Sequence, residues 1–446
     1  MTEVEATAPR SGLQALIDAA PITPIQIRLV LLCTLVTVTE GIDLTIIPLL
    51  APAIAKAWSL PPGAFSAIFA VGPVGLIVGG LGMGVLADRF GRRPSLIAAM
   101  ILMTVATLAT GFVASVTGLI ICRIAAGIGF GGVIPAATAL VSEFLPTRRR
   151  AAVVAFVILG QNVGGLVAAG IARQMIAAYG WQTIIFATGV ICAAVTLMLL
   201  IALPESPRYL LLRQLDGKRL RGMLLRLRIV ELPSADSERP EEGGRGGISD
   251  LFSNGRWLGT CLLWAAFIGV CADVSFFTNW LTLIYTYAGH PATTGISATA
   301  AYSLGGIISG LMLPLFCPRF GVTRVLMTCA LAGAASSAIL GSVLDGGTAI
   351  NLTLALCCGI FIPGAFYLVY PPAVAFYPTA IRSTGVGAAV AFGRIGNVLS
   401  PAAAGAMLAA GIGPAGVFWV MAGPMLLTFA AIACFRHVII GQVRVD

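Results

Sequence analysis

Charged residues are scarce in this sequence. They make up 10% of the 446 residues, whereas hydrophobic residues make up 58%. Because soluble domains contain about 25% charged residues, this composition excludes an ordinary water-soluble fold. Histidine is scarcer still, since only His290 in an expected outer loop and His437 near the C-terminus occur. A histidine proton relay inside a membrane is therefore excluded.

Patterns for metals, cofactors and covalent catalysis are also missing. The ten cysteines fall almost wholly in apolar stretches without the spacing of a metal site, so we expect them to be packing residues. No nucleophile and base stand in a catalytic pattern. We expect no enzyme activity, no metal and no cofactor. The first 24 residues lack the compact apolar core of a cleaved signal peptide.

Long hydrophobic runs fill most of the chain. Each is about long enough to cross the ~30 Å hydrocarbon core of a lipid bilayer as a helix. An even number of spans places both termini on one side, which we expect to be the cytoplasm. The sequence thus predicts an all-α membrane protein whose twelve spans are 25–50, 64–87, 94–114, 118–143, 151–177, 182–203, 257–287, 295–316, 322–343, 349–377, 383–409 and 414–436.

One long polar stretch, 204–256, separates two groups of six spans. It is rich in Arg, Glu, Pro and Gly, and we expect a cytoplasmic linker that is helical from Arg208 to Arg228 and flexible elsewhere. The predicted divisions are a cytoplasmic N-terminal segment 1–24, an N-terminal half 25–203, the linker 204–256, a C-terminal half 257–436 and a cytoplasmic tail 437–446.

The two halves repeat one another. Arg89-Phe90-Gly91 recurs as Arg319-Phe320-Gly321, and Pro146-Thr147 with Arg150 recurs as Pro378-Thr379 with Arg382. A parallel duplication of six helices favours a binding site at the midplane between the halves. The second copy is degraded, because Pro314 and Pro318 stand where the first has Gly84 and Asp88.

The net charge of +9 is distributed as membrane topology requires. Lys and Arg fall in, or at the edge of, segments expected in the cytoplasm, apart from Lys56, Arg123, Arg173 and Arg394. The positive-inside rule accounts for this asymmetry, and a nucleic-acid-binding surface does not. The expected partners are the lipid bilayer and small solutes, with no nucleic acid.

The stretch Gly84–Arg93, which joins the second and third spans, reads GVLADRFGRR. Gly91 permits a tight reversal, and Gly84 is expected to let another backbone approach closely. We expect an inner gate whose charges pair when that side is shut and separate when it opens; a merely solvated charged rim is the alternative. The gating candidates are Gly84, Asp88, Arg89, Gly91, Arg92, Arg93, Glu143 and Arg382.

This stretch resembles the signature loop G-x-L-A-D-R-x-G-R-R between helices 2 and 3 of the major facilitator superfamily. The resemblance implies the major facilitator fold, with 12 transmembrane helices in two pseudo-symmetric six-helix halves.

Charges within the spans are costly and usually functional. Glu40 and Asp43 are three residues apart, so they face the same side of the first helix. Arg123, in the fourth span, is expected at a similar depth to Asp43. The three are our proton-coupling candidates, because a carboxylate beside a guanidinium can switch between an ion pair and a neutral acid. A static ion pair is the alternative.

Arg394 is expected near the middle of the eleventh span, and its counterpart in the repeat is Asn162. A guanidinium grips a carboxylate with two parallel hydrogen bonds, so a substrate anion is its expected partner. A pair with Asp273 is the alternative. The substrate-binding candidates are Arg394, Gln161, Asn162, Asp273, Phe276, Trp280, Tyr302, Phe392 and Asn397; the aromatic residues among them either wall an apolar pocket or serve as packing or lipid-facing residues.

Further stretches resemble the aromatic acid:proton symporters. They are Leu13–Cys33, Glu40-Gly41-Ile42-Asp43, Arg123–Gly132, Glu143 with Pro146, Pro204–Arg208, Tyr377-Pro378-Thr379 with Arg382, and Gly393–Gly396. That family usually has Asp in the place of Glu40. The resemblance implies proton-coupled uptake of a benzoate-like or hydroxybenzoate-like carboxylate across a bacterial inner membrane, by a protein expected to be monomeric. The alternatives are a proton symporter of a non-aromatic organic or sugar acid, and a transport-inactive sensor on the same fold.

Overall fold

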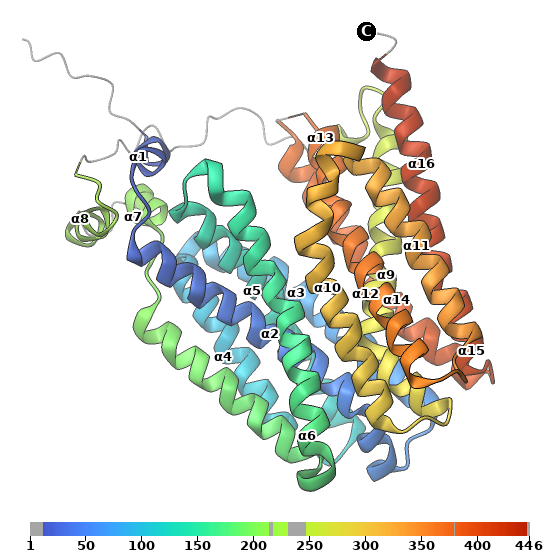
Figure 1. Ribbon diagram of the computed structural model, residues 1–446. Coiled ribbons are helices and arrows are strands. Elements are labelled where there is room, and N and C mark those ends of the chain that lie inside the picture. Colours follow the sequence, from blue (N-terminus) through green and yellow to red (C-terminus); the bar gives the residue numbers. More distant parts are fainter. Residues whose placement is uncertain (1–11, 214–216, 231–246, 379, 444–446) are drawn as a thin grey trace, which may run out of the picture.

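The computed structural model describes residues 12–213, 217–230, 247–378 and 380–443, and this part of the chain contains helices and no β strand (Figure 1). The membrane helices are α2 (Pro24–Trp58), α3 (Phe65–Phe90), α4 (Arg92–Thr110), α5 (Val116–Phe144), α6 (Thr147–Ala202), α9 (Trp257–Tyr287), α10 (Ala292–Phe320), α11 (Val322–Ser342), α12 (Thr348–Leu368), α13 (Tyr370–Phe376), α14 (Arg382–Ala409), α15 (Pro414–Met421) and α16 (Gly423–Val443).

These helices make the twelve expected crossings. By length and composition, ten helical segments of the described chain could cross a membrane. One of them, the 56-residue α6, reverses at Gly180, whose φ of 73° lies in the region that favours glycine, so it makes two crossings. The less apolar α14 is 28 residues long and supplies the twelfth. The all-α fold with twelve transmembrane helices is confirmed.

The first membrane helix, α2, is longer than the hydrophobic run in the sequence predicted. A capping box of Thr23 and Gln26 begins α2, and the helix continues to Trp58 although Pro48 and Pro52 lie inside it. Proline is tolerated there because neighbouring helices and local adjustments satisfy the freed backbone groups. The apolar pattern alone predicted that this span ends at residue 50.

The two groups of helices stand side by side, with α2 to α6 in one bundle and α9 to α16 in the other (Figure 1). Small residues let the helices pack closely within each bundle. A Cβ added at Gly79 of α3 would lie 2.0 Å from the Ile128 carbonyl oxygen of α5, so the two backbones touch there. Between the bundles, α3 packs against α14 and α2 against α9.

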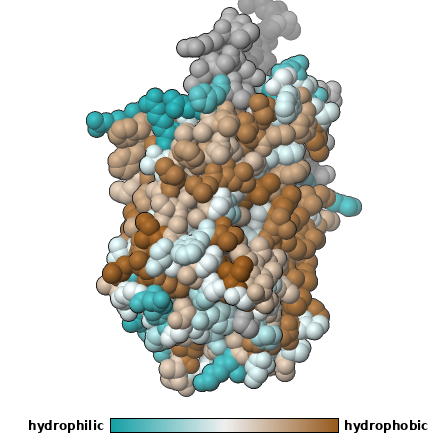
Figure 2. All heavy atoms as spheres, turned by 90° about the vertical axis from the view of Figure 1, so that its right-hand side faces the viewer, coloured by the Kyte–Doolittle hydropathy of each residue, from teal (hydrophilic) through white to brown (hydrophobic). Residues whose placement is uncertain are grey.

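We call the end of the bundle that carries α1 (Leu13–Ala19), α7 (Pro207–Arg213), α8 (Gly217–Arg226) and the last turn of α16 the terminal end (Figure 1). Figure 2 shows one face on which hydrophobic side chains cover much of the middle and many hydrophilic ones gather toward the two ends. Exposed apolar residues such as Leu315 and Trp419 suit contact with lipid.

The expected N-terminal segment and linker contain short helices. In α1, Leu13 and Ile17 are buried, and Asp18 accepts a hydrogen bond of 2.7 Å from the backbone nitrogen of Thr147 at the start of α6. The helix expected over 208–228 is present as α7 and α8, with residues 214–216 between them outside the described chain. A 3-10 turn, η3 (Ile248–Leu251), precedes α9.

Candidate functional site

A cavity of about 420 Å³ lies between the two bundles, within the size range of small-molecule sites. Helices α2, α3, α5 and α6 line it from one bundle, and α9, α10, α12, α13 and α14 from the other. Eight of the predicted site residues border it: Glu40, Asp43, Arg123, Gln161, Asn162, Tyr302, Arg394 and Asn397.

Asp43 and Arg123 meet as their expected depths suggested. Arg123 Nη1 lies 3.5 Å from Asp43 Oδ2, and Arg123 Nη2 donates to Thr110 Oγ1 at 2.9 Å. Both charged side chains are buried. The Arg123 guanidinium and the Thr107 hydroxyl therefore face the Asp43 carboxylate, which is the compensation that a buried charge requires.

The hydroxyl beside Asp43 belongs to Thr107 of α4. Its Oγ1 lies 2.7 Å from Asp43 Oδ1 and 2.9 Å from the Met103 carbonyl oxygen. A hydroxyl has one hydrogen to donate, so it serves the carboxylate or the carbonyl, not both. If Asp43 were protonated, it could donate to Thr107 while Thr107 donated to Met103, so Asp43 and Thr107 can hydrogen-bond to each other in both charge states.

Glu40 has a different environment one turn earlier in α2. Its side chain is 1% exposed, and its Oε2 has no hydrogen-bond partner in the described part of the chain. The positive charge that acts on it is that of Arg394, from the opposite bundle. An isolated buried carboxylate is costly, because burial removes the water that would solvate its charge.

Arg394 extends from α14 toward α3. Its Nη1 donates to the Leu76 carbonyl oxygen at 2.6 Å, which joins the two bundles at the cavity. It forms no ion pair with Asp273 among the described residues. Asp273 is fully buried and does not border the cavity, and neither of its carboxylate oxygens has a hydrogen-bond partner among the described residues.

Three aromatic candidates also lie away from the cavity. Trp280 donates from Nε1 to the Pro401 carbonyl at 3.1 Å and packs edge-on against Phe69, while Phe276 packs edge-on against Phe277 and Phe418. Phe392 stacks on Trp264 with ring centroids 3.7 Å apart. Of the predicted aromatic wall, only Tyr302 borders the cavity; the other rings that line it are Phe69, Phe130, Phe267, Phe366, Tyr367 and Tyr370.

Sequence reasoning missed Tyr367 and Tyr370. Asn162 Nδ2 of α6 donates to Tyr367 Oη at 2.6 Å, so this pair also crosses between the bundles. The available signal was the cluster Phe366, Tyr367 and Tyr370 just after Pro363, where apolar character gives way to aromatic side chains with polar tips.

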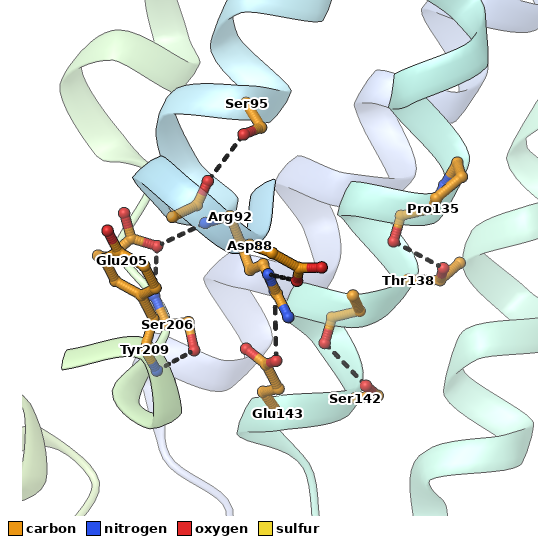
Figure 3. Close-up of polar contacts among 12 residues, drawn as sticks. Asp88, Arg92, Ser95, Pro135, Thr138, Ser142, Glu143, Glu205, Ser206 and Tyr209 are labelled. Atoms are coloured by element: carbon orange, nitrogen blue, oxygen red, sulfur yellow. Dashed lines mark hydrogen bonds and ion pairs between the residues drawn. The ribbon is translucent and has the colours of Figure 1, made fainter. Parts of the chain in front are cut away.

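The signature stretch forms a compact charged cluster at the terminal end (Figure 3). Arg92 Nη1 lies 2.7 Å from Asp88 Oδ1, and Arg92 Nε lies 3.5 Å from Glu143 Oε1. Gly91 has a φ of 108°, which confirms the expected tight reversal. The expected close approach at Gly84 was wrong: a Cβ there would meet no atom within 4 Å, because helix contact in α3 occurs earlier, at Gly75 and Gly79.

The other gating candidates make separate contacts. Arg93 donates from Nε to the Leu203 carbonyl at 2.8 Å and from Nη2 to the Leu200 carbonyl at 2.7 Å. Arg89 lies over the ring of Phe90. In the other bundle, Arg382 Nε donates to the Tyr377 carbonyl at 3.2 Å.

Glu205 was not among the candidates, yet it anchors the signature stretch (Figure 3). Its Oε1 accepts from the backbone nitrogens of Arg92 at 3.0 Å, Arg93 at 3.1 Å and Ser206 at 2.9 Å. A carboxylate at the first turn of α4 satisfies amides that have no partner within the helix. Burial raises the pKa of the Glu205 carboxyl, and these backbone hydrogen bonds oppose that shift.

The two bundles contact each other at the end opposite the terminal end. Arg173 of α6 donates to Ser297 of α10, and Phe69 of α3 packs edge-on against Trp280 of α9. A Cβ added at Gly405 of α14 would overlap the Ser66 side chain of α3. Cross-bundle contacts therefore reach from this end to the level of the cavity. No group of three or more metal-binding side chains occurs in the described residues.

Residues 33–401 match the family model described as the Major Facilitator Superfamily. The chain belongs to this superfamily. It is 30% identical over 394 residues to the "4-hydroxybenzoate transporter PcaK" of Pseudomonas aeruginosa, covering 87% of this chain and 88% of that one. It is 27% identical over 407 residues to the "Benzoate transport protein" of Acinetobacter baylyi, covering 88% and 86%.

Among solved structures, the chain is similar to the xylose transporter XylE from E. coli in a partially occluded inward open conformation, with a TM-score of 0.73, 17% identity and coverage of 92% of this chain and 97% of that one. At this identity the similarity shows the fold alone. Together the comparisons identify a multi-pass membrane transporter rather than an enzyme, and they confirm the resemblance to aromatic acid transporters.

Proposed function

We propose that this protein takes up an aromatic carboxylate, such as a benzoate or a hydroxybenzoate, together with protons across a bacterial inner membrane by alternating access. The observation that carries the proposal is that Arg394 and Glu40, whose Oε2 has no hydrogen-bond partner among the described residues, border the same aromatic-walled cavity from opposite bundles. The names of the relatives support the substrate class. In this proposal the terminal end faces the cytoplasm.

The substrate's carboxylate binds Arg394 in this proposal. A guanidinium donates two parallel hydrogen bonds to a carboxylate, which a lysine ammonium cannot do. The rings of Phe366, Tyr367 and Tyr370 supply apolar surface for an aromatic ring, and the tyrosine hydroxyls and the amide of Gln161 supply polar contacts for ring hydroxyls.

Coupling to protons follows from competition for Arg394. When Glu40 is ionised, the guanidinium is already neutralised, and a second anion beside it is repelled by the first. When Glu40 carries a proton, Arg394 is free to hold the substrate. Substrate anion and proton therefore bind together, which is the requirement for symport. The other titratable or charged groups that border the same cavity are Asp43, Arg123, Cys271, Tyr302, Tyr367 and Tyr370.

Asp43 and Arg123 form the second proton-coupling pair in the proposal. The Thr107 hydroxyl can follow the charge state of Asp43 by turning between that carboxylate and the Met103 carbonyl. A proton on Asp43 would, however, remove the counter-charge of the buried Arg123, which is costly. The carboxylate of Asp43 already has direct partners in this conformation, whereas Oε2 of Glu40 has none among the described residues, so we assign the first proton to Glu40.

Gating is assigned to the signature stretch and its partners. The contacts of Asp88, Arg92 and Glu143 described above lie within the first bundle, and the bundles contact each other at the opposite end. We propose that this cluster bridges to the second bundle, through Arg382, when the terminal end closes.

The test is transport by the purified protein in liposomes. Labelled 4-hydroxybenzoate and benzoate should accumulate when an inward proton gradient is imposed and should not accumulate when the gradient is abolished. Arg394→Gln is the matched variant that should abolish uptake in either case. Uptake of a sugar acid in place of aromatic acids would contradict the substrate class. Binding of 4-hydroxybenzoate without any transport would indicate a sensor and overturn the proposal.

A further inference from the structure

The hydrogen bond between Arg394 and Leu76 links the two bundles within the membrane. Arg394 Nη1 of α14 donates to the Leu76 carbonyl oxygen of α3 at 2.6 Å. A carbonyl oxygen has two lone pairs, so it can accept this bond in addition to its bond within the helix. The guanidinium is therefore held by a backbone atom, whose position no side-chain rotation changes.

Gly80 makes this hydrogen bond possible. It lies four residues after Leu76, so the two positions are on the same face of α3. A Cβ added at Gly80 would lie 2.8 Å from Arg394 Nη1 and 3.3 Å from Nη2. Any side chain at this position would therefore push the guanidinium away from the carbonyl. Neighbouring Gly82 is different, because a Cβ there would meet no atom within 4 Å.

The bond leaves one edge of the guanidinium available. Arg394 Nε and Nη2 donate to none of the described residues, and the side chain borders the cavity. The Nε and Nη2 hydrogens form an edge that binds a carboxylate with two parallel hydrogen bonds. A side chain already fixed at Nη1 loses less rotational freedom when the ligand arrives, which favours binding.

We infer that Gly80 is a positioning residue for substrate binding: by leaving the Leu76 carbonyl uncovered, it fixes the Arg394 guanidinium with its Nε–Nη2 edge free for the substrate carboxylate. This inference rests on the proposed function for the identity of the ligand. According to this inference, the contact with α3 determines whether the Arg394 guanidinium is fixed before the ligand binds or is free to move.

The variant Gly80→Ala tests the inference directly. The atoms that its Cβ would meet are at the end of a flexible arginine, so the helix can accept alanine while the guanidinium moves. The dissociation constant for 4-hydroxybenzoate should rise about fivefold to twentyfold, tenfold corresponding to 1.4 kcal/mol. Gly80→Val should act in the same direction and more strongly. The matched control is Gly82→Ala, on the same helix, which should leave binding unchanged.

A double-mutant cycle separates positioning from a general effect on α3. If Gly80 acts through Arg394, then Gly80→Ala should have no further effect on binding in an Arg394→Lys background, which retains weak binding. Effects that simply add, or equal effects of Gly80→Ala and Gly82→Ala in the unmodified background, would overturn the inference.

A substrate-free measurement keeps this inference distinct from the proposed function. Spin labels attached at Arg149 and Arg324, which are exposed and on different bundles, report the distance between the bundles without ligand. Gly80→Ala and Arg394→Gln should broaden the distance distribution alike, and Gly82→Ala should not. If the wild-type protein binds no aromatic acid but these variants still broaden the distribution, the proposed ligand is wrong and the Gly80 contact stands. An unchanged distribution in Gly80→Ala would refute the contact itself.

Discussion

Replacing Glu40 with glutamine tests whether the substrate and a proton bind together because both act on Arg394. Glutamine has nearly the shape of protonated glutamate and cannot ionise. Since Oε2 of Glu40 has no hydrogen-bond partner among the described residues, the variant loses no contact of that atom and should fold as the parent does. The substitution therefore changes charge with little change in packing.

The expected size of the effect follows from Coulomb's law. Two unit negative charges about 5 Å apart, at an effective dielectric constant of about 20, repel by about 3 kcal/mol. That corresponds to roughly a 200-fold change in affinity for the substrate anion. Wild-type affinity should therefore fall as the pH rises and Glu40 ionises, whereas Glu40→Gln should bind tightly and with little dependence on pH.

Two transport assays in the same vesicles complete the test. Counterflow, in which internal substrate exchanges for labelled external substrate, needs no net proton movement and should persist in Glu40→Gln. Accumulation driven by a pH gradient should be lost. Asp43→Asn is a less clean comparison, because it leaves Arg123 buried without its counter-charge, at a cost of about 3–5 kcal/mol. Full gradient-driven accumulation by Glu40→Gln would refute the competition mechanism and move the proton to Asp43.

Three other variants probe the binding site, the gate and the terminal end. Arg394→Lys should weaken carboxylate binding by about 1–3 kcal/mol, measured as a dissociation constant, because the planar pair of donors is lost; unchanged affinity would make Arg394 structural. Asp88→Asn should slow transport cycling with little change in substrate affinity, and normal uptake at matched expression would remove it from the gate. The Thr147 backbone amide holds the pKa of Asp18 below its ordinary value, so this contact stabilises the fold above about pH 4 and is lost as the pH falls through the lowered pKa. Hydrogen exchange of the α1 backbone amides in the wild-type protein should therefore approach that in Asp18→Asn as the pH is lowered. A difference between the two proteins that persists unchanged at low pH would contradict this.

The membrane spans and the signature loop were predictable because their signals are local. A run of apolar residues and a glycine that needs a positive φ are properties of one segment, and the Gly91 reversal follows from them. The end of α2 was not predictable in this way. Pro48 and Pro52 interrupt a helix in water, but in a membrane the surrounding helices allow it to continue to Trp58.

The direction in which individual side chains point was harder to predict, because it depends on how each helix is rotated about its axis relative to its neighbours. Tyr302 and Phe392 were both candidates for an aromatic wall, yet Tyr302 borders the cavity and Phe392 stacks on Trp264. Glu205 was missed for a related reason. Its partners are backbone amides 112 and 113 residues earlier in the chain, and no sequence pattern names them.

The contrast between the two acids of α2 bears most directly on mechanism. Asp43 faces a hydroxyl and a guanidinium from its own bundle; the Thr107 hydroxyl can pair with it in either charge state, but protonation would remove the counter-charge of the buried Arg123. Oε2 of Glu40 has no hydrogen-bond partner among the described residues, and Arg394, which borders the same cavity, belongs to the opposite bundle, which moves relative to α2 in the proposed mechanism. Any rocking of the bundles that shifts Arg394 changes the electrostatic environment of Glu40 and leaves that of Asp43 nearly intact. In the proposed mechanism, a proton on Glu40 therefore responds both to the substrate and to the position of the bundles, which is the combination that coupling requires.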